Sequence, residues 1–420
     1  MTEELLKQRK EMLTDLVNDK TYVPMKLKEL AVFLNIPKHQ REELKEVLDI
    51  LEIPYDKIPC IHVTGTNGKG STVNYIANIL TKAKMKVGTF TSPYIISHQD
   101  RFRVGQKIMN DKDFLNLLNC YYPSIERYGL SMFEADVLLS FVYFYEKKVD
   151  LVVIEAGIGG RSDKTNILSA PLASVITNIG YDHLAQIGPT LSDVAYQKAG
   201  IIKEGCPVFI SSMEPSLQEV IEKEAKLKHS QLHVVEAPVQ DTTVFSYKGI
   251  EHIDLGPVAN YQIKNACLAI EVVQTLFPHI QDEVIRQGLH NVLWPGRFEY
   301  YNYRHKDIYL DGAHNISAFE ALLPSIEKIR NNRQVSVIYS SLKDKDYQKM
   351  AEMICQAGYE LCVCQFEDER ALTQKQADEL EATYYFDSID DALSNLGQLN
   401  ELVIVCGSLH FISQFRQKLQ

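Results

Sequence analysis

Apolar residues gather in short continuous runs along this chain, and longer amphipathic stretches separate the runs. Short apolar runs predict strands that are buried on both faces, whereas amphipathic stretches predict helices that cover a sheet. Their alternation predicts an α/β fold in which helical crossovers join parallel strands. In the first part of the chain the predicted strands are 58–64, 87–91, 151–155 and 173–178, and a helix is predicted over 71–84.

A second series of strand-like runs follows the segment Trp294-Pro295-Gly296-Arg297. Neither proline nor glycine continues regular structure, so we place a domain boundary near residue 295. A chain of 420 residues is long enough for two domains, which we expect to cover residues 1–295 and 296–420. The predicted strands of the second, smaller domain are 307–310, 335–339, 359–364 and 402–406.

Composition narrows the classes of protein to consider. Apolar residues make up 45% of the chain and charged residues 24%, which is typical of soluble globular proteins and excludes a disordered or collagen-like chain. The 44 Lys and Arg residues are outnumbered by 55 Asp and Glu residues, and the net charge of -11 has the wrong sign for a protein that binds nucleic-acid backbones. We therefore expect no nucleic-acid partner.

No segment of the sequence predicts export or membrane insertion. Charged residues run through the N-terminal segment, and no apolar run approaches the ~18 residues that a membrane span needs. The eight cysteines lie mostly inside apolar runs, as buried thiols of a reducing compartment do. We expect a cytoplasmic protein with no membrane partner. Cys362 and Cys364 are expected to be packing residues, because no second Cys or His pair lies nearby to complete a zinc site.

A glycine-rich segment, GTNGKGS at residues 65–71, lies between the first predicted strand and the next helix. Its backbone N–H groups, the helix N-terminus and the charge of Lys69 suit phosphate binding, and Ser71 can offer a hydroxyl to magnesium. Val63 stands where the usual phosphate-loop pattern has its first glycine, so the loop is a variant. We favour nucleotide binding over a simple glycine turn. The expected fold is a P-loop ATPase-like doubly wound domain followed by a smaller Rossmann-like α/β domain.

Polar residues stand at the carboxyl ends of three predicted strands, where ligands bind in doubly wound sheets. Glu155 ends one strand, His183 follows the next, and Ser92 ends the strand after the loop helix. Taken singly, they would be a buried salt bridge, a core histidine and a serine turn before proline. Together around a triphosphate they suit Mg²⁺, which we favour. Lys198 has the setting of a surface lysine, and its neighbours alone indicate no role.

Longer motifs make the sequence resemble folylpolyglutamate synthase and bifunctional dihydrofolate synthase, which belong to the Mur ligase superfamily. Residues 62–71 (HVTGTNGKGS) look like the first signature of that family, and residues 154–166 (IEAGIGGRSDKTN) look like the second. The resemblance spans nearly the whole chain. Shorter matches are Thr91-Ser92-Pro93, Phe133-Glu134, Asp182-His183, Lys198-Ala199-Gly200-Ile201, Trp294-Pro295-Gly296-Arg297, Leu310-Asp311-Gly312-Ala313-His314-Asn315 and Leu342-Lys343-Asp344-Lys345-Asp346.

The resemblance implies a site that spans both domains and uses ATP with two magnesium ions. It implies that Lys198 is carbamylated, which turns a cation into an anion that can hold the second Mg²⁺. The implied catalytic residues are Lys69, Lys198, Arg297 and His314, and the implied metal ligands are Ser92, Glu155, His183 and Lys198. ATP would contact Asn67, Gly68, Lys69, Gly70, Ser71, Asn265, Arg297 and Asp311, and the pterin substrate Ser131, Met132, Phe133, Glu134, Ser162, Asp163 and Lys164.

The activity implied by the resemblance is ATP-dependent ligation of L-glutamate to a folate-type carboxylate through an acyl phosphate. The acceptor would be tetrahydrofolyl-polyglutamate, dihydropteroate or both, and we expect a monomer whose partners are these small molecules. Dihydrofolate synthase activity alone, or a Mur-type ligase with another carboxylate substrate, stays open. The chain departs from the family at Lys164, where Ala or Ser is usual, at Gln99-Asp100-Arg101, near the usual Asn-Glu-Arg, and at His410, where Tyr is usual. Residues 25–40 also lack the expected Leu-Gly-rich start.

Three other classes compete with this interpretation. A murein-precursor ligase carries an additional N-terminal domain, for which the 57 residues before the first predicted strand are too few. A P-loop kinase or motor would explain Lys69 but not the second-domain matches at Arg297 and Asp311. A silent nucleotide-binding module would have lost the loop lysine or the metal ligands, and these residues are present.

Overall fold

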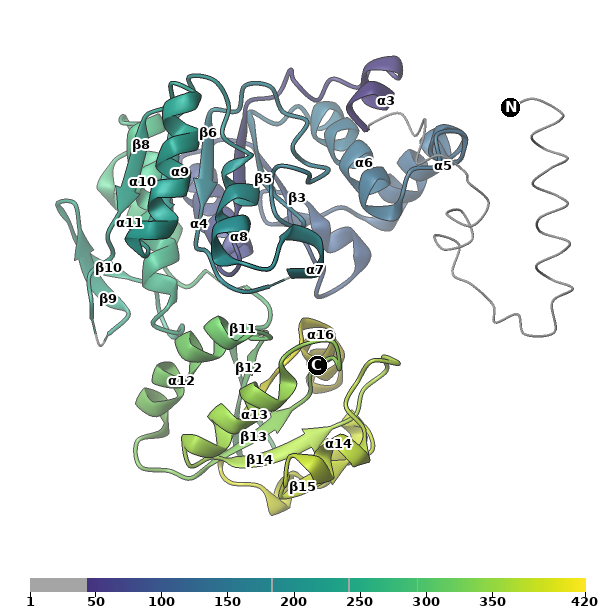
Figure 1. Cartoon of the computed structure of the whole chain (residues 1–420), viewed down its shortest axis with the longest axis vertical. Coiled ribbons are helices and arrows are strands. Elements are labelled where there is room, and N and C mark those ends of the chain that lie inside the picture. Colours follow the sequence, from purple (N-terminus) through teal and green to yellow (C-terminus); the bar gives the residue numbers. More distant parts are fainter. Residues whose placement is uncertain (1–43, 183, 241, 293) are drawn as a thin grey trace, which may run out of the picture.

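The computed structural model describes residues 44–182, 184–240, 242–292 and 294–420, and these form two α/β domains, each around its own sheet. The larger domain lies above the smaller one in Figure 1, and the chain enters the smaller domain through β11. The predicted α/β class is therefore confirmed. Residues 25–40, at which the sequence departs from its expected family pattern, lie outside the described residues.

The sheet of the larger domain has eight strands in the order β4-β3-β2-β5-β1-β6-β7-β8. The strands from β2 to β8 in this order run parallel, and β3 and β4 add an antiparallel edge. The central strands are continuous apolar runs because helices cover both of their faces. Their bounds are β1 Cys60–Thr64, β2 Val87–Phe90, β3 Phe102–Val104, β4 Lys107–Ile108, β5 Leu151–Glu155, β6 Ala173–Ile176, β7 Val208–Ser211 and β8 Leu232–Val235.

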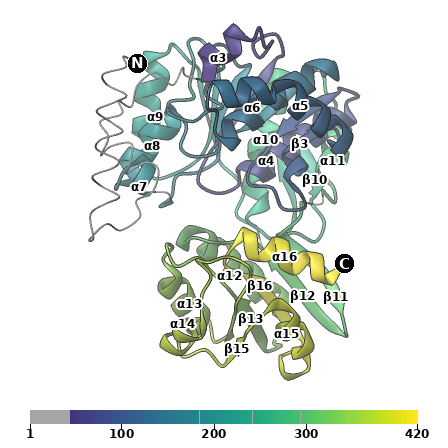
Figure 2. The ribbon, with the colours of Figure 1, turned by 90° about the vertical axis from the view of Figure 1, so that its right-hand side faces the viewer.

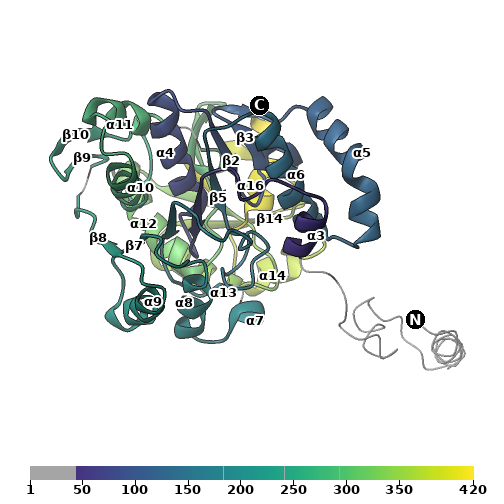
Figure 3. The same ribbon diagram turned by 90° about the horizontal axis from the view of Figure 1, so that it is seen from above.

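Two helical layers enclose this sheet. Helices α4, α10 and α11 cover one face, which includes Ile61 and Val153, and α6 covers the other face, which includes Val152 and Ile154. Figure 3 shows α4, α10 and α11 on one side of the central strands and α6 on the other. The bounds are α3 Leu44–Ile50, α4 Lys69–Lys82, α5 Asp111–Arg127, α6 Met132–Glu146, α7 Leu184–Ile187, α8 Leu191–Ala199, α9 Pro215–Leu227, α10 Gln262–Leu276 and α11 Asp282–Leu289, with a hairpin of β9 Val244–Tyr247 and β10 Ile250–Asp254.

The smaller domain has a six-stranded sheet in the order β11-β12-β16-β13-β14-β15, in which only β11 is antiparallel among these strands. Helices α12 and α13 cover one face, and α15 and α16 cover the other. Cys362 and Cys364 are buried on the second face, as predicted for packing residues. The bounds are β11 Arg297–Tyr303, β12 Lys306–Asp311, α12 Ile316–Arg330, β13 Val335–Tyr339, α13 Tyr347–Gln356, β14 Glu360–Cys364, α14 Gln374–Glu379, β15 Tyr384–Phe386, α15 Ile389–Ser394, β16 Leu402–Cys406 and α16 Leu409–Leu419.

Helix α16 lies on the side of the smaller domain that faces the larger one (Figure 2). Ser413 in this helix donates its hydroxyl to the backbone carbonyl of Ile95, in the loop that follows β2. Gly296 lies beside Ile412, where a β-carbon would come within 2.8 Å of the isoleucine side chain. The C-terminal helix therefore packs against the loop that carries Ser92.

The predicted strands agree with observed ones to within two residues at either end. Strands at the margins were missed, because the sequence pattern detects continuous apolar runs and these strands lack them. In β11 half-buried and exposed residues alternate from Glu299 onward, and β3 and β4 have only three and two residues. The predicted helix 71–84 also lies two residues too late, since α4 begins at Lys69 inside the glycine-rich segment.

Candidate active site

The glycine-rich loop joins β1 to α4 and surrounds the N-terminus of that helix. Gly68 has a φ of 82°, a left-handed conformation that favours glycine. A β-carbon on Gly68 would lie 2.3 Å from Asn265 Oδ1, so glycine also permits the close approach of α10. In the part of the chain that the structure describes, no side chain caps α4, so its first N–H groups are available to a phosphate.

Lys69 lies over this loop and is held by the loop backbone. Its Nζ donates to the carbonyl oxygens of Gly65 at 3.1 Å and Thr66 at 3.2 Å, and it lies 4.0 Å from Glu155 Oε1. The side chain keeps 17% exposure. A cation in this position can offset the charge of the terminal phosphates of a nucleotide.

Asn178, two residues after the end of β6, holds the first half of the loop. Its Oδ1 accepts the N–H groups of Thr66 at 3.1 Å and Asn67 at 2.7 Å. No role was predicted for Asn178 from the sequence. Its position at the carboxyl end of a predicted strand was the available signal, because three other strand ends supplied candidate residues.

Gln262, the first residue of α10, holds the second half of the loop and was also missed. Its Nε2 donates to Ser71 Oγ at 3.2 Å, and its Oε1 accepts from Asn265 Nδ2 at 2.9 Å. The N-terminus of α10 therefore packs against the phosphate loop. This contact brings the predicted ATP-contacting residues Ser71 and Asn265 together.

Glu155 places a buried carboxylate beside the loop, at the end of β5. Its Oε2 accepts the N–H of Ser92 at 3.3 Å, and a β-carbon on Gly70 would lie 3.2 Å from the same oxygen. Burial raises the pKa of Glu155 to about 7, although Lys69 opposes the rise. A buried carboxylate next to a serine is a donor set that suits Mg²⁺. The third predicted ligand, His183, lies outside the described residues.

Lys198 is buried, with 3% exposure, near the C-terminus of α8. Its neighbours in the sequence predict a surface lysine, and that prediction is wrong because the second glycine-rich segment packs over the end of this helix. A β-carbon on Gly160 would lie 3.0 Å from the carbonyl oxygen of Lys198. Burial, with a smaller contribution from the charge of Lys69, lowers the pKa of Lys198 to about 7. The amine can therefore be neutral near pH 7.

Asp311, at the end of β12, is engaged by donors of the protein itself. Its Oδ2 accepts from Tyr261 Oη at 2.6 Å and from the N–H of Phe298 at 2.9 Å, and its Oδ1 accepts from the N–H of Ala313 at 2.9 Å. Burial raises the pKa of this carboxyl, which these hydrogen bonds oppose. In this structure the hydrogen bonds of Asp311 link the residue before α10 with β11 and with the loop after β12.

His314 and Arg297 bring cationic or basic groups from the smaller domain to the larger one. His314 Nδ1 donates to the carbonyl of Gly312 at 2.8 Å, and its Nε2 lies 3.5 Å from Asp182 Oδ2 of the larger domain. Arg297 begins β11 and is near enough to Glu155 to lower that residue's pKa. The predicted residues of the second domain therefore lie close to the phosphate loop.

The two predicted pterin-binding segments also lie together. Lys164 Nζ is 3.1 Å from Glu134 Oε1, and Glu134 Oε2 accepts from Ser131 at the start of α6. Met132 and Ser162 are exposed, whereas Asp163 Oδ2 accepts the N–H of Ile158 and shapes its own loop. Phe133 packs against Phe90 and fills the space beside Gly157.

Arg101, in the segment that departs from the expected family pattern, is a buried cation near these groups. Its side chain is 7% exposed, and Nε lies 3.4 Å from Asp136 Oδ2. Among the described residues neither Nε nor Nη1 has a hydrogen-bond acceptor. The guanidinium carbon lies 5.3 Å from the ring centre of Tyr94 and 5.8 Å from that of Phe133. A guanidinium with spare donors between two rings can receive an anionic group.

A hollow beside the loop runs along the start of α4 to the segment before β11. Trp294, the only tryptophan of the chain, forms one wall and stacks against Arg103 with the guanidinium carbon 5.1 Å from the ring centre. A β-carbon on Gly70 would lie 3.2 Å from the Trp294 ring. The residues that line the hollow are Ser71, Asn74, Tyr75, Val258, Gln262, Val292, Trp294 and Arg297.

Comparison with known proteins identifies the family of the chain. A family model described as Mur ligase middle domain matches residues 63–273, and one described as Mur ligase, glutamate ligase domain matches residues 296–409. The chain is 37% identical to a dihydrofolate synthase/folylpolyglutamate synthase of Bacillus subtilis (strain 168) over 408 residues, which covers 90% of this chain and 94% of that protein. The chain belongs to the folylpolyglutamate synthase/dihydrofolate synthase family.

Other members of the folylpolyglutamate synthase/dihydrofolate synthase family agree. A folylpolyglutamate synthase of Lacticaseibacillus casei is 31% identical over 405 residues, covering 89% of this chain and 92% of that protein. A solved FPGS–AMPPCP–folate complex has a TM-score of 0.78 and 26% identity, covering 98% of this chain and 99% of that one. In the described residues of this family member, no helix is long and apolar enough to cross a membrane.

Proposed function

We propose that this protein is an ATP-dependent ligase that joins L-glutamate to a folate-type carboxylate and releases ADP and phosphate. One observation carries the proposal: the phosphate loop, which leads into the uncapped N-terminus of α4, pairs through Asn67 with Asn315 of the smaller domain, and Asp182 beside it contacts His314 and Lys345 of that domain. A ligase that couples ATP to an amino acid needs such an arrangement. Membership of the family and the names of the relatives support the choice of folate and glutamate.

ATP is the proposed nucleotide, and the solved complex with AMPPCP, an ATP analogue, supports it. Its phosphates would lie over Asn67 to Ser71, and its nucleoside would lie beside the loop near Asn265 and Trp294, which adjoin Gly68 and Gly70. Ser92 and Glu155, with His183, would hold Mg²⁺. When bound, Mg²⁺ would offset charge on the phosphates and make the γ-phosphorus a better electrophile.

The reaction needs no nucleophile from the protein. The carboxylate of the acceptor attacks the γ-phosphorus of ATP, which gives an acyl phosphate and ADP, and the amine of glutamate then displaces phosphate to form the amide. The protein contributes positioning and charge. Lys69 would stabilise negative charge on the transferred phosphoryl group, and Arg297 could clamp an anionic group from the opposite domain.

We further propose that Lys198 is carbamylated and that the carbamate holds a second Mg²⁺. Carbamylation needs a neutral amine, because only the unprotonated nitrogen attacks CO₂. The burial of Lys198, which lowers its pKa to about 7, supports a neutral amine. Burial and the like charge of Lys69 disfavour the protonated amine more than Asp182 and Asp163 favour it.

The domain boundary near residue 295 and the site of action also remain proposals. The two sheets have no strand in common, and Gly296, with a φ of 66°, stands between the helical end of the first domain and β11, which supports the boundary. All eight cysteines are free, which supports a reducing compartment such as the cytoplasm. We propose that the enzyme acts there as a monomer.

Binding of AMPPCP should change the fluorescence of Trp294, because this ring lies beside Gly70 of the phosphate loop, over which the phosphates would bind. The signal is specific, since the chain has one tryptophan. A titration that follows tryptophan emission measures the effect, and Trp294→Phe provides the blank. If calorimetry shows that AMPPCP binds but tryptophan emission does not change, the nucleotide binds away from Trp294.

The proposed function is tested by ADP release from the purified protein with ATP, Mg²⁺ and L-glutamate, with 7,8-dihydropteroate or tetrahydrofolate as acceptor. We expect turnover that depends on both glutamate and the acceptor. Turnover with dihydropteroate alone would restrict the activity to dihydrofolate synthase. Glutamate-independent phosphate release would instead favour an ATPase or kinase.

A Mur-type ligase with a different carboxylate substrate is the second candidate. The ion pair between Lys164 and Glu134 favours it, because this cation lies in a segment where the family usually has a small residue. The same assay separates the candidates. Binding of AMPPCP without turnover of either folate acceptor would support the second candidate and contradict the first.

A further inference from the structure

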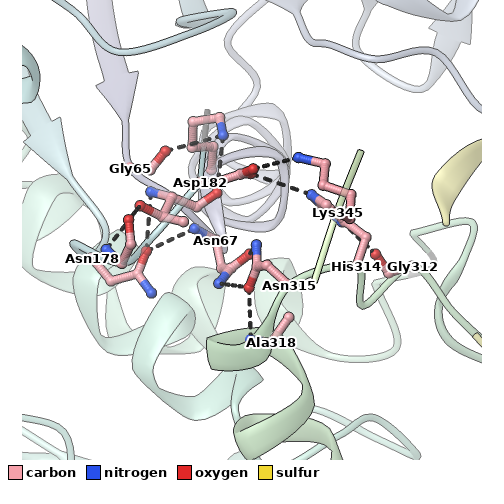
Figure 4. A network of polar contacts seen from close by, with 12 residues as sticks. Gly65, Asn67, Asn178, Asp182, Gly312, His314, Asn315, Ala318 and Lys345 are labelled. Atoms are coloured by element: carbon pink, nitrogen blue, oxygen red, sulfur yellow. Dashed lines mark hydrogen bonds and ion pairs between the residues drawn. The ribbon is translucent and has the colours of Figure 1, made fainter. Parts of the chain in front are cut away.

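Five side chains join the two domains at the phosphate loop, and Figure 4 shows them in one network. Asp182, from the loop after β6, contacts Lys345 and His314 of the smaller domain. A short distance away, Asn67 of the phosphate loop pairs with Asn315. Both contacts link loops at the carboxyl ends of strands, which is where ligands bind in such sheets.

Asp182 uses both carboxylate oxygens across the interface. Its Oδ1 lies 2.5 Å from Lys345 Nζ, and its Oδ2 lies 3.5 Å from His314 Nε2. The side chain of Asp182 is 9% exposed and that of Lys345 is 19% exposed. At this burial the charges are poorly screened, so the pair is stronger than a pair on the surface.

The second contact is a reciprocal pair of amides. Asn67 Nδ2 donates to Asn315 Oδ1 at 3.1 Å, and Asn315 Nδ2 donates to Asn67 Oδ1 at 3.0 Å. Asn315 also caps α12, since its Oδ1 accepts the N–H of Ala318 at 2.9 Å. Asn67 in turn is held by Asn178. The phosphate loop is therefore connected directly to the N-terminus of a helix in the smaller domain.

Two separate contacts fix an orientation, whereas one contact would leave the domains free to rotate about it. Asp182 restrains the loop that carries Lys345 and the loop that carries His314, and the Asn67–Asn315 pair restrains the start of α12. The residues that the smaller domain would offer to an amino acid are thus placed relative to the phosphates of ATP. Misplacement of reacting groups by about 1 Å can cost about a hundredfold in rate.

We propose that Asp182 is a positioning residue that, through Lys345 and His314, sets the amino-acid side of the site against the phosphate loop, with the Asn67–Asn315 pair as its second anchor. The inference rests on the proposed ligase function. Asp182 touches neither substrate in this role. Its loss impairs use of the amino acid and leaves binding of the nucleotide to the larger domain intact.

A double-mutant cycle tests the proposal, with Asp182→Asn, Lys345→Met and both together, assayed for turnover at varied glutamate, ATP and Mg²⁺. We expect each single variant to lower kcat/KM for glutamate by at least about tenfold, with the ATP affinity from Trp294 fluorescence changed less than about twofold. The double variant should be no slower than the slower single variant, because both remove one interaction. Lys343→Met is the matched control, since this exposed lysine lies on the same loop and its side chain donates to the carbonyl of Glu369 in the smaller domain.

Three outcomes would overturn the proposal. Additive losses would show that Asp182 and Lys345 act separately. A raised Mg²⁺ requirement in Asp182→Asn, but not in Lys345→Met, would place the effect of Asp182 at the metal. An unchanged kcat/KM for glutamate in both single variants would show that the contact between Asp182 and Lys345 does not position the amino-acid side of the site.

A second variant keeps the test valid if Asp182→Asn does not fold. Asn315→Ser removes the amide pair with Asn67 but retains a residue that caps helices well. The proposal expects a selective loss in kcat/KM for glutamate with unchanged thermal stability, and an unchanged kcat/KM for glutamate would contradict it.

If the unaltered protein turns over neither acceptor, the proposed function fails. X-ray scattering then tests the contacts alone, since Asp182→Asn should enlarge the radius of gyration and an identical profile would refute them.

Discussion

Lys69→Ala should lower kcat by about 10²–10³-fold, which is about 2.7–4 kcal/mol of transition-state stabilisation and typical for loss of one preorganised charge-stabilising group. Lys69 is held by Gly65 and Thr66 over an uncapped helix N-terminus, and it is placed to meet negative charge on the transferred phosphoryl group. Steady-state ADP release measures the loss. The loss should appear in kcat with every acceptor, because phosphoryl transfer precedes use of glutamate.

Lys82→Ala is the matched control for this experiment. Lys82 lies in the last turn of the same helix, is exposed, and is remote from the loop in the chain. We expect its turnover to equal that of the unaltered protein. A similar loss in both variants would mean that the charge of Lys69 acts at long range or through stability, and not at the phosphates.

Lys198→Ala should lower turnover by at least about tenfold, or roughly 1.4 kcal/mol of barrier, because the carbamate and the second Mg²⁺ it would hold are lost. Lys198→Arg should be equally impaired, since a guanidinium keeps the charge but forms no carbamate. Turnover at saturating ATP and Mg²⁺ measures the effect. A smaller loss than tenfold would rule out the carbamate role.

Modification of Lys198 can also be observed directly. Incubation with ¹³C-labelled bicarbonate should give a carbamate carbon signal in the NMR spectrum that disappears in Lys198→Ala. Lys203→Ala is the control, because burial also lowers the pKa of Lys203 although it lies beyond the end of α8. Survival of the signal in Lys198→Ala would assign the carbamate to another amine.

Much of the fold followed from the sequence because the central strands are covered on both faces. Such strands must be continuously apolar, as β5 and β16 are, and this pattern is visible without a structure. The marginal strands obey no such rule. In β9 buried and exposed residues alternate over only four positions, too few for a pattern to stand out.

A site residue could be predicted where it adjoins the end of a predicted strand. It could not be predicted where its position depends on packing against residues far away in the sequence. Glu155 ends a buried strand, so its position was evident. The burial of Lys198 depends on Gly160, far from it in the chain, and neighbouring residues carry no trace of that contact. Asp311 was assigned to ATP, and its hydrogen bond from Tyr261 depends on how the two domains meet.

The contacts of Asp182 and Asn67 with the smaller domain bear on how relatives can be recombined. A chimaera that takes the larger domain from one family member and the smaller from another would inherit each half of these contacts from a different parent. Where the parents differ at the pair Asp182 and Lys345, or at the pair Asn67 and Asn315, both domains of the hybrid would fold, but the contacts between them would be lost. An active hybrid therefore requires that these four residues be taken together from one parent.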